Sequence, residues 1–150
     1  GLEDPLAERV LHWAARLHEI GLDISHSGHH KHAAYLLEHA DMPGFPKEEQ
    51  RLLACLVGGH RRKIQLERAD ELVPPWHTRV LYLTVLLRLA VLLNRGRSRV
   101  PLPPLRLEAK GRTLELRLPR GWLRDHPLTR ADLLVEVDYL RSVGLRLRVF

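Results

Sequence analysis

The feature that most limits the possible folds is a nearly unbroken apolar run from Val80 to Leu93, in which only Thr84 and Arg88 are not apolar. The run is shorter than the ~20 residues needed to cross a bilayer, so we expect no integral membrane segment. It predicts instead a helix over residues 76–94 that is buried on most sides of a helical domain. A buried charge needs partners, so Arg88 should either be paired inside the domain or point into a cleft.

Three shorter helices are expected before this run. Asp4 can cap the first helix, Pro5 fits its first position, and Gly21 is a natural stop. A turn rich in proline and glycine at residues 41–46 separates the other two. These helices are predicted over residues 29–40, with Ser27 as a candidate cap, and over residues 46–58.

The hydrophobic period changes after the proline-rich stretch at residues 100–104. Residues 105–108 and 114–118 alternate with a period of two around Lys110, Gly111 and Arg112, which predicts a β-hairpin. A helix over 130–141 and a last strand over 145–150 complete the pattern. We therefore predict a mainly α protein: a helical bundle at residues 1–99, followed by a small β-β-α-β (α+β) cap at residues 100–150.

Composition and charge limit the class of partner. The chain is 45% apolar and 28% charged, which is ordinary for a globular protein, and its lone Cys55 suits a buried thiol in a reducing compartment. Residues 60–130 carry sixteen Lys or Arg against six Asp or Glu. This excess favours an anionic partner, and the alternative is a solvated, arginine-rich surface. Aromatic residues are 5% of the chain and do not interleave with the basic runs, so we expect no nucleic-acid partner.

Histidines are concentrated in two places. Four of them lie between Ser25 and His32, and His60 directly precedes Arg61, Arg62 and Lys63. Imidazoles and a carboxylate from facing helices suit a divalent transition ion. The candidate metal ligands are His18, Glu19, His32 and His60. Taken singly, the better interpretation of His26, His29, His30 and His39 is that each is an exposed residue on a helix surface.

Several segments resemble a known family. His18-Glu19, His32 and His60 resemble the HD phosphohydrolase pattern. The wider sequence is similar to the C-terminal region of the exopolyphosphatase and guanosine pentaphosphate phosphohydrolase family, through LHEIGL (17–22), SHSGHHKHAAYLL (25–37), DMPGF (41–45), VGGHRRK (57–63) and LLRLAVLLNRGR (86–97). Two positions depart from the HD pattern: Glu19 replaces an aspartate, and Val91 stands where a second aspartate is expected. Valine cannot bind a metal ion, so the bundle is expected to be a degenerate HD-like domain without a metal site.

The resemblance implies a function for a longer protein. It points to the C-terminal region of an exopolyphosphatase, a cytoplasmic homodimer in which N-terminal actin-like domains of the same chain use Mg²⁺ to release terminal orthophosphate processively. The present chain would then hold no catalytic residue and no cofactor. The alternative is the same region of a guanosine pentaphosphate 5′-phosphohydrolase, and an autonomous HD phosphohydrolase is the least favoured. A purine needs aromatic platforms, whereas the tryptophans and tyrosines here mostly follow apolar patterns typical of a core.

Within this resemblance we expect inorganic polyphosphate to be bound by cationic side chains. Arginine matches phosphate oxygens with two parallel hydrogen bonds, and lysine acts as a point charge. Partly protonated histidines would add charge that varies near neutral pH. The predicted polyphosphate-binding residues are His18, His32, His60, Arg61, Arg62, Lys63, Arg95, Arg97 and Arg99.

Overall fold

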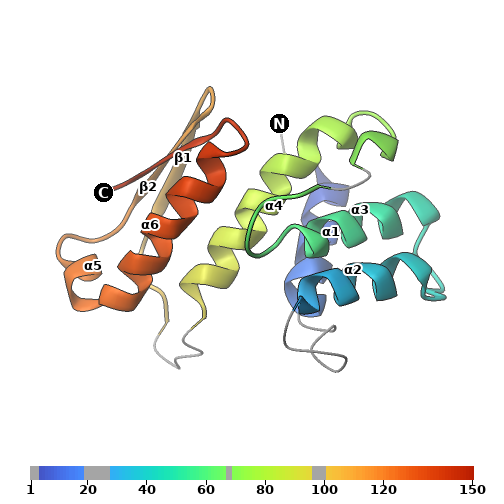
Figure 1. Ribbon diagram of the computed structural model, residues 1–150, viewed down its shortest axis with the longest axis horizontal. Helices are drawn as coiled ribbons and strands as arrows, with labels where there is room; N and C mark the ends of the chain where they lie inside the picture. Colours follow the sequence, from blue (N-terminus) through green and yellow to red (C-terminus); the bar gives the residue numbers. More distant parts are fainter. Residues whose placement is uncertain (1–3, 19–27, 67–68, 96–100) are drawn as a thin grey trace. The chain divides into compact units, whose positions relative to one another are not determined.

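The computed structural model describes residues 4–18, 28–66, 69–95 and 101–150 (Figure 1). The chain forms two compact units, which we call the N-terminal unit (Gly1–Leu89) and the C-terminal unit (Ala90–Phe150). The boundary between them falls within the long helix α4 (Trp76–Leu93). The predicted division after residue 99 falls outside the described residues and stays a prediction.

Helix α1 (Pro5–Leu17) begins as its sequence predicts. The Asp4 carboxylate accepts a hydrogen bond from the backbone N–H of Leu6 at 2.8 Å, and Pro5 occupies the first turn, where its missing N–H costs nothing. The predicted stop at Gly21 lies outside the described residues. One face of α1 is buried in the unit through Ala7, Val10 and Ala14.

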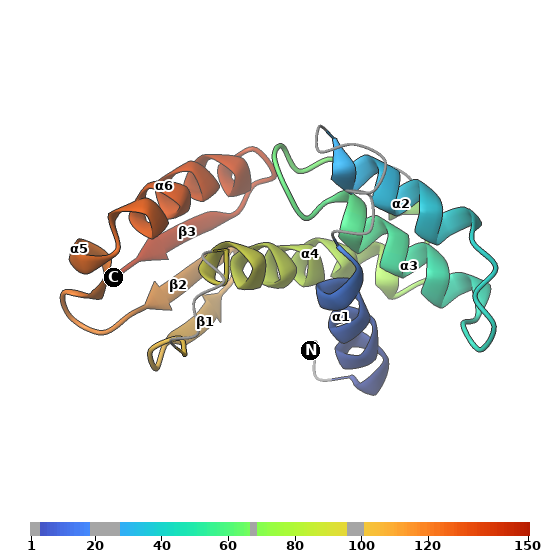
Figure 2. The ribbon, with the colours of Figure 1, turned by 90° about the horizontal axis from the view of Figure 1, so that it is seen from below.

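Helices α2 (His29–His39) and α3 (Lys47–Gly58) lie side by side (Figures 1 and 2). Buried Gln50 joins them, because its side-chain amide donates to the carbonyls of Leu37 and Ala40, each at 2.7 Å. These carbonyls belong to the end of α2, where a helix lacks internal partners. The predicted cap of α2, Ser27, lies outside the described residues.

Helix α4 follows a short 3-10 turn, η2 (Ala69–Glu71). Its Arg88 was expected either to be paired inside the domain or to point into a cleft. Arg88 is 3% exposed and donates to the carbonyl of Gly59 at 2.8 Å and to that of Arg62 at 2.7 Å. It is therefore paired inside the N-terminal unit. By length and composition α4 is apolar enough to cross a membrane, a test that the core helix of a soluble protein also passes. The buried, paired Arg88 supports the core-helix interpretation.

The C-terminal unit contains a three-stranded sheet in the order β1-β2-β3. Strands β1 (Arg106–Lys110) and β2 (Thr113–Arg117) form the predicted antiparallel hairpin, and β3 (Arg146–Val149) pairs parallel to β2. Between β2 and β3 run the short helix α5 (Trp122–Asp125) and the helix α6 (Pro127–Arg141). Helix α6 begins at Pro127, before the predicted residue 130, because proline is favoured in the first turn.

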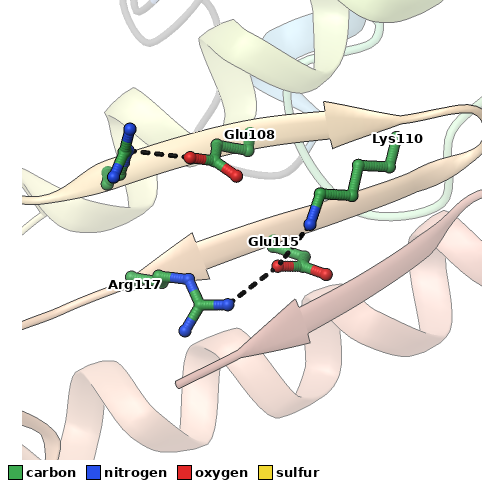
Figure 3. A network of polar contacts seen from close by, with 5 residues as sticks. Glu108, Lys110, Glu115 and Arg117 are labelled. Atoms are coloured by element: carbon green, nitrogen blue, oxygen red, sulfur yellow. Dashed lines mark hydrogen bonds and ion pairs between the residues drawn. The ribbon is translucent and has the colours of Figure 1, made fainter.

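Alternation along β2 separates an apolar face from a charged face of the sheet. Leu114 and Leu116 are buried on one face; Glu115, on the other, is also buried and lies between Lys110, at 3.8 Å, and Arg117, at 3.0 Å (Figure 3). Lys110 and Glu115 are on neighbouring strands, and Arg117 is two residues after Glu115 on the same strand, so all three side chains share one face of the sheet. The predicted fold class, mainly α with a small β-containing cap, is confirmed.

Candidate functional site

Four histidines of the N-terminal unit form a cluster, in which His60 is surrounded by three others. The ring centroid of His60 lies 5.1 Å from that of His18, 5.4 Å from that of His29 and 6.2 Å from that of His30. The cluster joins the end of α1, the first turn of α2 and the residue two positions after α3. Two of the predicted site residues, His18 and His60, are thus brought together by the fold.

The expectation that His29 and His30 are exposed is wrong. Their side chains are 7% and 5% exposed, because both contact the ring of His60 from the first turn of α2. His39, at the other end of α2, is exposed as expected. Helical periodicity places His29 and His30 on the helix, but the partner that covers them follows another helix, about thirty residues later.

Burial keeps His60 and His30 uncharged. The pKa of His60 is lowered to about 3, mainly by burial and also by the neighbouring imidazoles, against a hydrogen bond from Nδ1 to the Val57 carbonyl that raises it. Burial and then the charge of Arg61 lower the pKa of His30 to about 4. Both side chains are therefore neutral at pH 7. The expectation that His60 adds positive charge near neutral pH is wrong, and the cation charge near the cluster comes from the residues that follow it.

Those residues, Arg61, Arg62 and Lys63, form what we call the basic tract. Arg61 is half-buried, and the side chains of Arg62 and Lys63 are exposed. Arg62 has a backbone φ of +59°, a left-handed conformation that is unfavourable for a residue with a long side chain. The hydrogen bond from Arg88 to the Arg62 carbonyl holds this conformation. The tract is thus presented to solvent by a strained backbone that is anchored from inside the unit.

The other predicted site residues are not gathered at the cluster. His32 is half-buried on α2 and makes no ring contact with His60 among the residues that the structure describes. Arg95 pairs with Asp132 at 3.2 Å within the C-terminal unit. Glu19, Arg97 and Arg99 lie outside the described residues. In the described ranges no three His, Cys, Asp or Glu side chains are placed to hold a metal ion.

Comparison with known proteins places this chain in a family. Residues 2–137 match the family model described as Ppx/GppA phosphatase, domain III. The chain belongs to the Ppx/GppA phosphatase family. A relative from Aeromonas salmonicida is 33% identical over 90% of the chain and 27% of the relative's length. Another, from Vibrio cholerae, is 38% identical over 99% of the chain and 29% of the relative's length.

The names of these Ppx/GppA relatives bear on the choice between the two predicted activities. Both are called guanosine-5′-triphosphate,3′-diphosphate pyrophosphatase. They therefore support the alternative interpretation, the guanosine pentaphosphate phosphohydrolase, better than the exopolyphosphatase that the sequence analysis preferred. The chain spans less than a third of the length of either relative, so its matches cover one region of a larger Ppx/GppA protein.

Sequence reasoning missed three residues of this Ppx/GppA domain that shape the site. His29 and His30 complete the cluster, and Arg88 anchors the backbone of the basic tract. A signal was present for Arg88, since a charge in an apolar helix requires a partner. No local signal showed that the partners of Arg88 would be backbone carbonyls 26 and 29 positions earlier in the chain.

Proposed function

We propose that this chain is the C-terminal part of a guanosine pentaphosphate phosphohydrolase and that it binds the phosphate groups of the nucleotide. The observation that carries the proposal is the similarity to relatives named for that substrate, at 33% and 38% identity over nearly the whole chain. The basic tract supports the binding role, because two adjacent arginines and a lysine next to neutral histidines suit a multiply charged anion.

In the whole protein, hydrolysis would be carried by N-terminal actin-like domains of the same chain, with Mg²⁺ as their cofactor, in a cytoplasmic homodimer. The region described here would hold the substrate and would not act on it. No catalytic residue is assigned to it, because neither the cluster nor the basic tract presents an activated nucleophile. The family match to a third domain supports the presence of other domains.

A second candidate is the polyphosphate-binding region of an exopolyphosphatase. It is favoured by the same tract, since three consecutive cations suit a uniform chain of phosphates without any base to recognise. The predicted contacts His18, Arg61, Arg62 and Lys63 would serve either ligand. The two candidates differ in whether a guanine base adds affinity.

The test is direct binding by the 150-residue chain, measured by calorimetry at several salt concentrations. We expect guanosine pentaphosphate to bind more tightly than polyphosphate of equal charge. Replacing Arg61, Arg62 and Lys63 together by alanine should weaken binding roughly tenfold or more and flatten the salt dependence. The matched control removes three exposed arginines of the C-terminal unit, Arg120, Arg124 and Arg141, with the same change in net charge.

Equal losses in both triple variants would refute a specific role for the basic tract. A polyphosphate affinity that exceeds the nucleotide affinity and rises with chain length would transfer the proposal to the exopolyphosphatase. Binding of neither ligand would refute both candidates for this region.

A further inference from the structure

A cavity of about 280 Å³ lies between α2, α3 and the segment that leads from the basic tract to η2. Its volume is close to the lower end of the ~300–1,000 Å³ typical of small-molecule sites. Two helices line it with residues three or four positions apart, which share one helical face. These are Lys31, Ala34, Tyr35 and Glu38 from α2, and Arg51, Ala54, Cys55 and Gly58 from α3. The cavity lies entirely within the N-terminal unit.

Small residues form an apolar patch of this cavity where α2 and α3 approach each other. A Cβ added to Gly58 would lie 3.1 Å from the Cβ of Ala34, so the two helices approach closely at this point. Ala54 continues the same small-residue surface along α3. This patch of alanine and glycine, bordered by the longer side chains of Lys31, Glu38 and Arg51, suits a flat, rigid group such as an aromatic heterocycle.

Polar groups also line the cavity, both from the first turn of α2 and from the segment that leads to η2. His30 is 5% exposed, and its Nδ1 is buried with no hydrogen-bond partner in the described part of the chain. Glu71 lines the cavity and lies near Cys55, whose thiol pKa is raised to about 11 by burial first and then by the charge of Glu71. Lys31 and Lys63 supply two ammonium groups, and neither forms an ion pair with a described residue.

Tyr35 supplies an aromatic ring at the edge of the cavity. Its side chain is 64% exposed, with His39 beside it at a centroid distance of 4.4 Å. The sequence analysis expected the tyrosines to lie mostly in the core, and for Tyr35 that expectation is wrong. An exposed tyrosine beside a cavity is a platform on which a nucleobase stacks.

We propose that this cavity binds the guanine base of a guanosine polyphosphate, with the phosphates lying along the basic tract. Guanine presents adjacent N1–H and N2–H₂ donors, which a carboxylate such as Glu71 accepts together. Its O6 and N7 accept hydrogen bonds from a lysine ammonium group or from the N–H of a neutral imidazole. Adenine lacks that pair of donors and would place an acceptor against the carboxylate.

The connection to the phosphates is built into the chain. Lys63 is both the last residue of the basic tract and part of the cavity lining, so a base in the cavity places its phosphates beside Arg62 and Arg61. His30 likewise belongs to both the cavity and the histidine cluster. This inference rests on the proposed function, because that proposal supplies the guanosine polyphosphate.

Cys55 allows a test that reports on this cavity alone. It is the chain's only cysteine and lines the cavity, so the rate at which a thiol reagent labels it measures access to the site. A ligand that fills the cavity at ten times its Kd should slow labelling about elevenfold. We expect that protection from guanosine pentaphosphate, weaker protection from GTP, and none from ATP or inorganic tripolyphosphate at equal concentration.

Variants identify the groups that recognise the base. Glu71→Gln and Tyr35→Ala should each weaken guanosine pentaphosphate binding roughly tenfold while leaving tripolyphosphate binding unchanged. Glu8→Gln is the matched control for charge, because Glu8 is exposed on α1 and does not line the cavity. Circular dichroism would be used to check that each variant is folded.

The outcomes separate this inference from the proposal on which it rests. Nucleotide binding without protection of Cys55 would overturn the cavity assignment and leave the proposed function intact. Equal protection by tripolyphosphate and guanosine pentaphosphate would show a phosphate pocket and refute recognition of guanine. Equal protection by ATP would refute selectivity for the guanine edge. Binding of no nucleotide at all would refute both proposals.

Discussion

Replacing His60 by glutamine tests whether the centre of the histidine cluster is an uncharged part of the fold. Glutamine is polar and can still donate a hydrogen bond, but it takes up no proton. The wild-type side chain is 4% exposed and has its pKa lowered to about 3, mainly by burial. The variant therefore removes one titration and retains a polar group at the same position.

The size of the effect follows from the two pKa values of His60. In the unfolded chain the pKa is near 6.5, so between pH 6.5 and about 3 only the unfolded chain binds the proton. The free energy of unfolding is thus unaffected by His60 above pH 6.5 and falls as the pH falls through this window. At pH 5, about 1.5 units below the unfolded pKa, His60 should cost about 2 kcal/mol. His30, with a pKa of about 4, should add a similar loss.

The assay is urea unfolding at pH 7.5 and pH 5.0, followed by circular dichroism. Between these pH values the wild-type chain should lose about 2 kcal/mol more stability than His60→Gln. The control is His77→Gln, which removes an exposed histidine at the start of α4 and should lose as much as wild type. An equal loss in wild type and His60→Gln would contradict the assignment of His60 as a neutral, buried imidazole.

Three further variants probe the support of the basic tract, each measured by urea unfolding. Arg88→Met leaves the buried carbonyl of Gly59 and the partly buried carbonyl of Arg62 without their donor and should cost about 3 kcal/mol. Arg79→Met removes a partly exposed ion pair at 3.7 Å and should cost about 1 kcal/mol or less; similar costs would argue against an anchoring role. Arg62→Gly relieves the strain of a left-handed backbone conformation, so the free energy of unfolding should stay unchanged or rise by up to ~1 kcal/mol, while nucleotide affinity falls. A marked loss of stability would contradict the strain argument. Gly59→Ala places a Cβ 2.7 Å from Leu66 Cδ2 and 2.9 Å from Thr84 Cγ2 and should cost about 1–3 kcal/mol. Full wild-type stability would show that both neighbouring side chains yield at this point.

Much of the fold was predictable because its signals are local. Asp4 and Pro5 start α1, Pro46 precedes α3, and Gly111, with φ of +59°, makes the turn of the hairpin. Each of these signals acts on residues within a few positions of itself, through capping, fixed φ or tolerance of positive φ. The alternation after residue 105 likewise predicted the strands without knowledge of their partners.

The site was predictable only in part. His18 and His60 were singled out from their types and spacing, and the fold brings them together. His29 and His30 were misjudged, because a histidine has no strong preference for surface or core and its burial depends on what covers it. The charge expected from His60 was wrong for the same reason, since burial decides its pKa.

The sequence alone determined which segments are helices or strands, their order, and the presence of a basic segment, since all three depend on residue type and near neighbours. The tertiary structure alone decided which histidines are neutral, which carbonyls accept hydrogen bonds from the Arg88 guanidinium, and where a cavity remains between α2 and α3. These properties arise where segments tens of residues apart pack together. Desolvation, pairing and empty volume belong to that packing and not to any one segment.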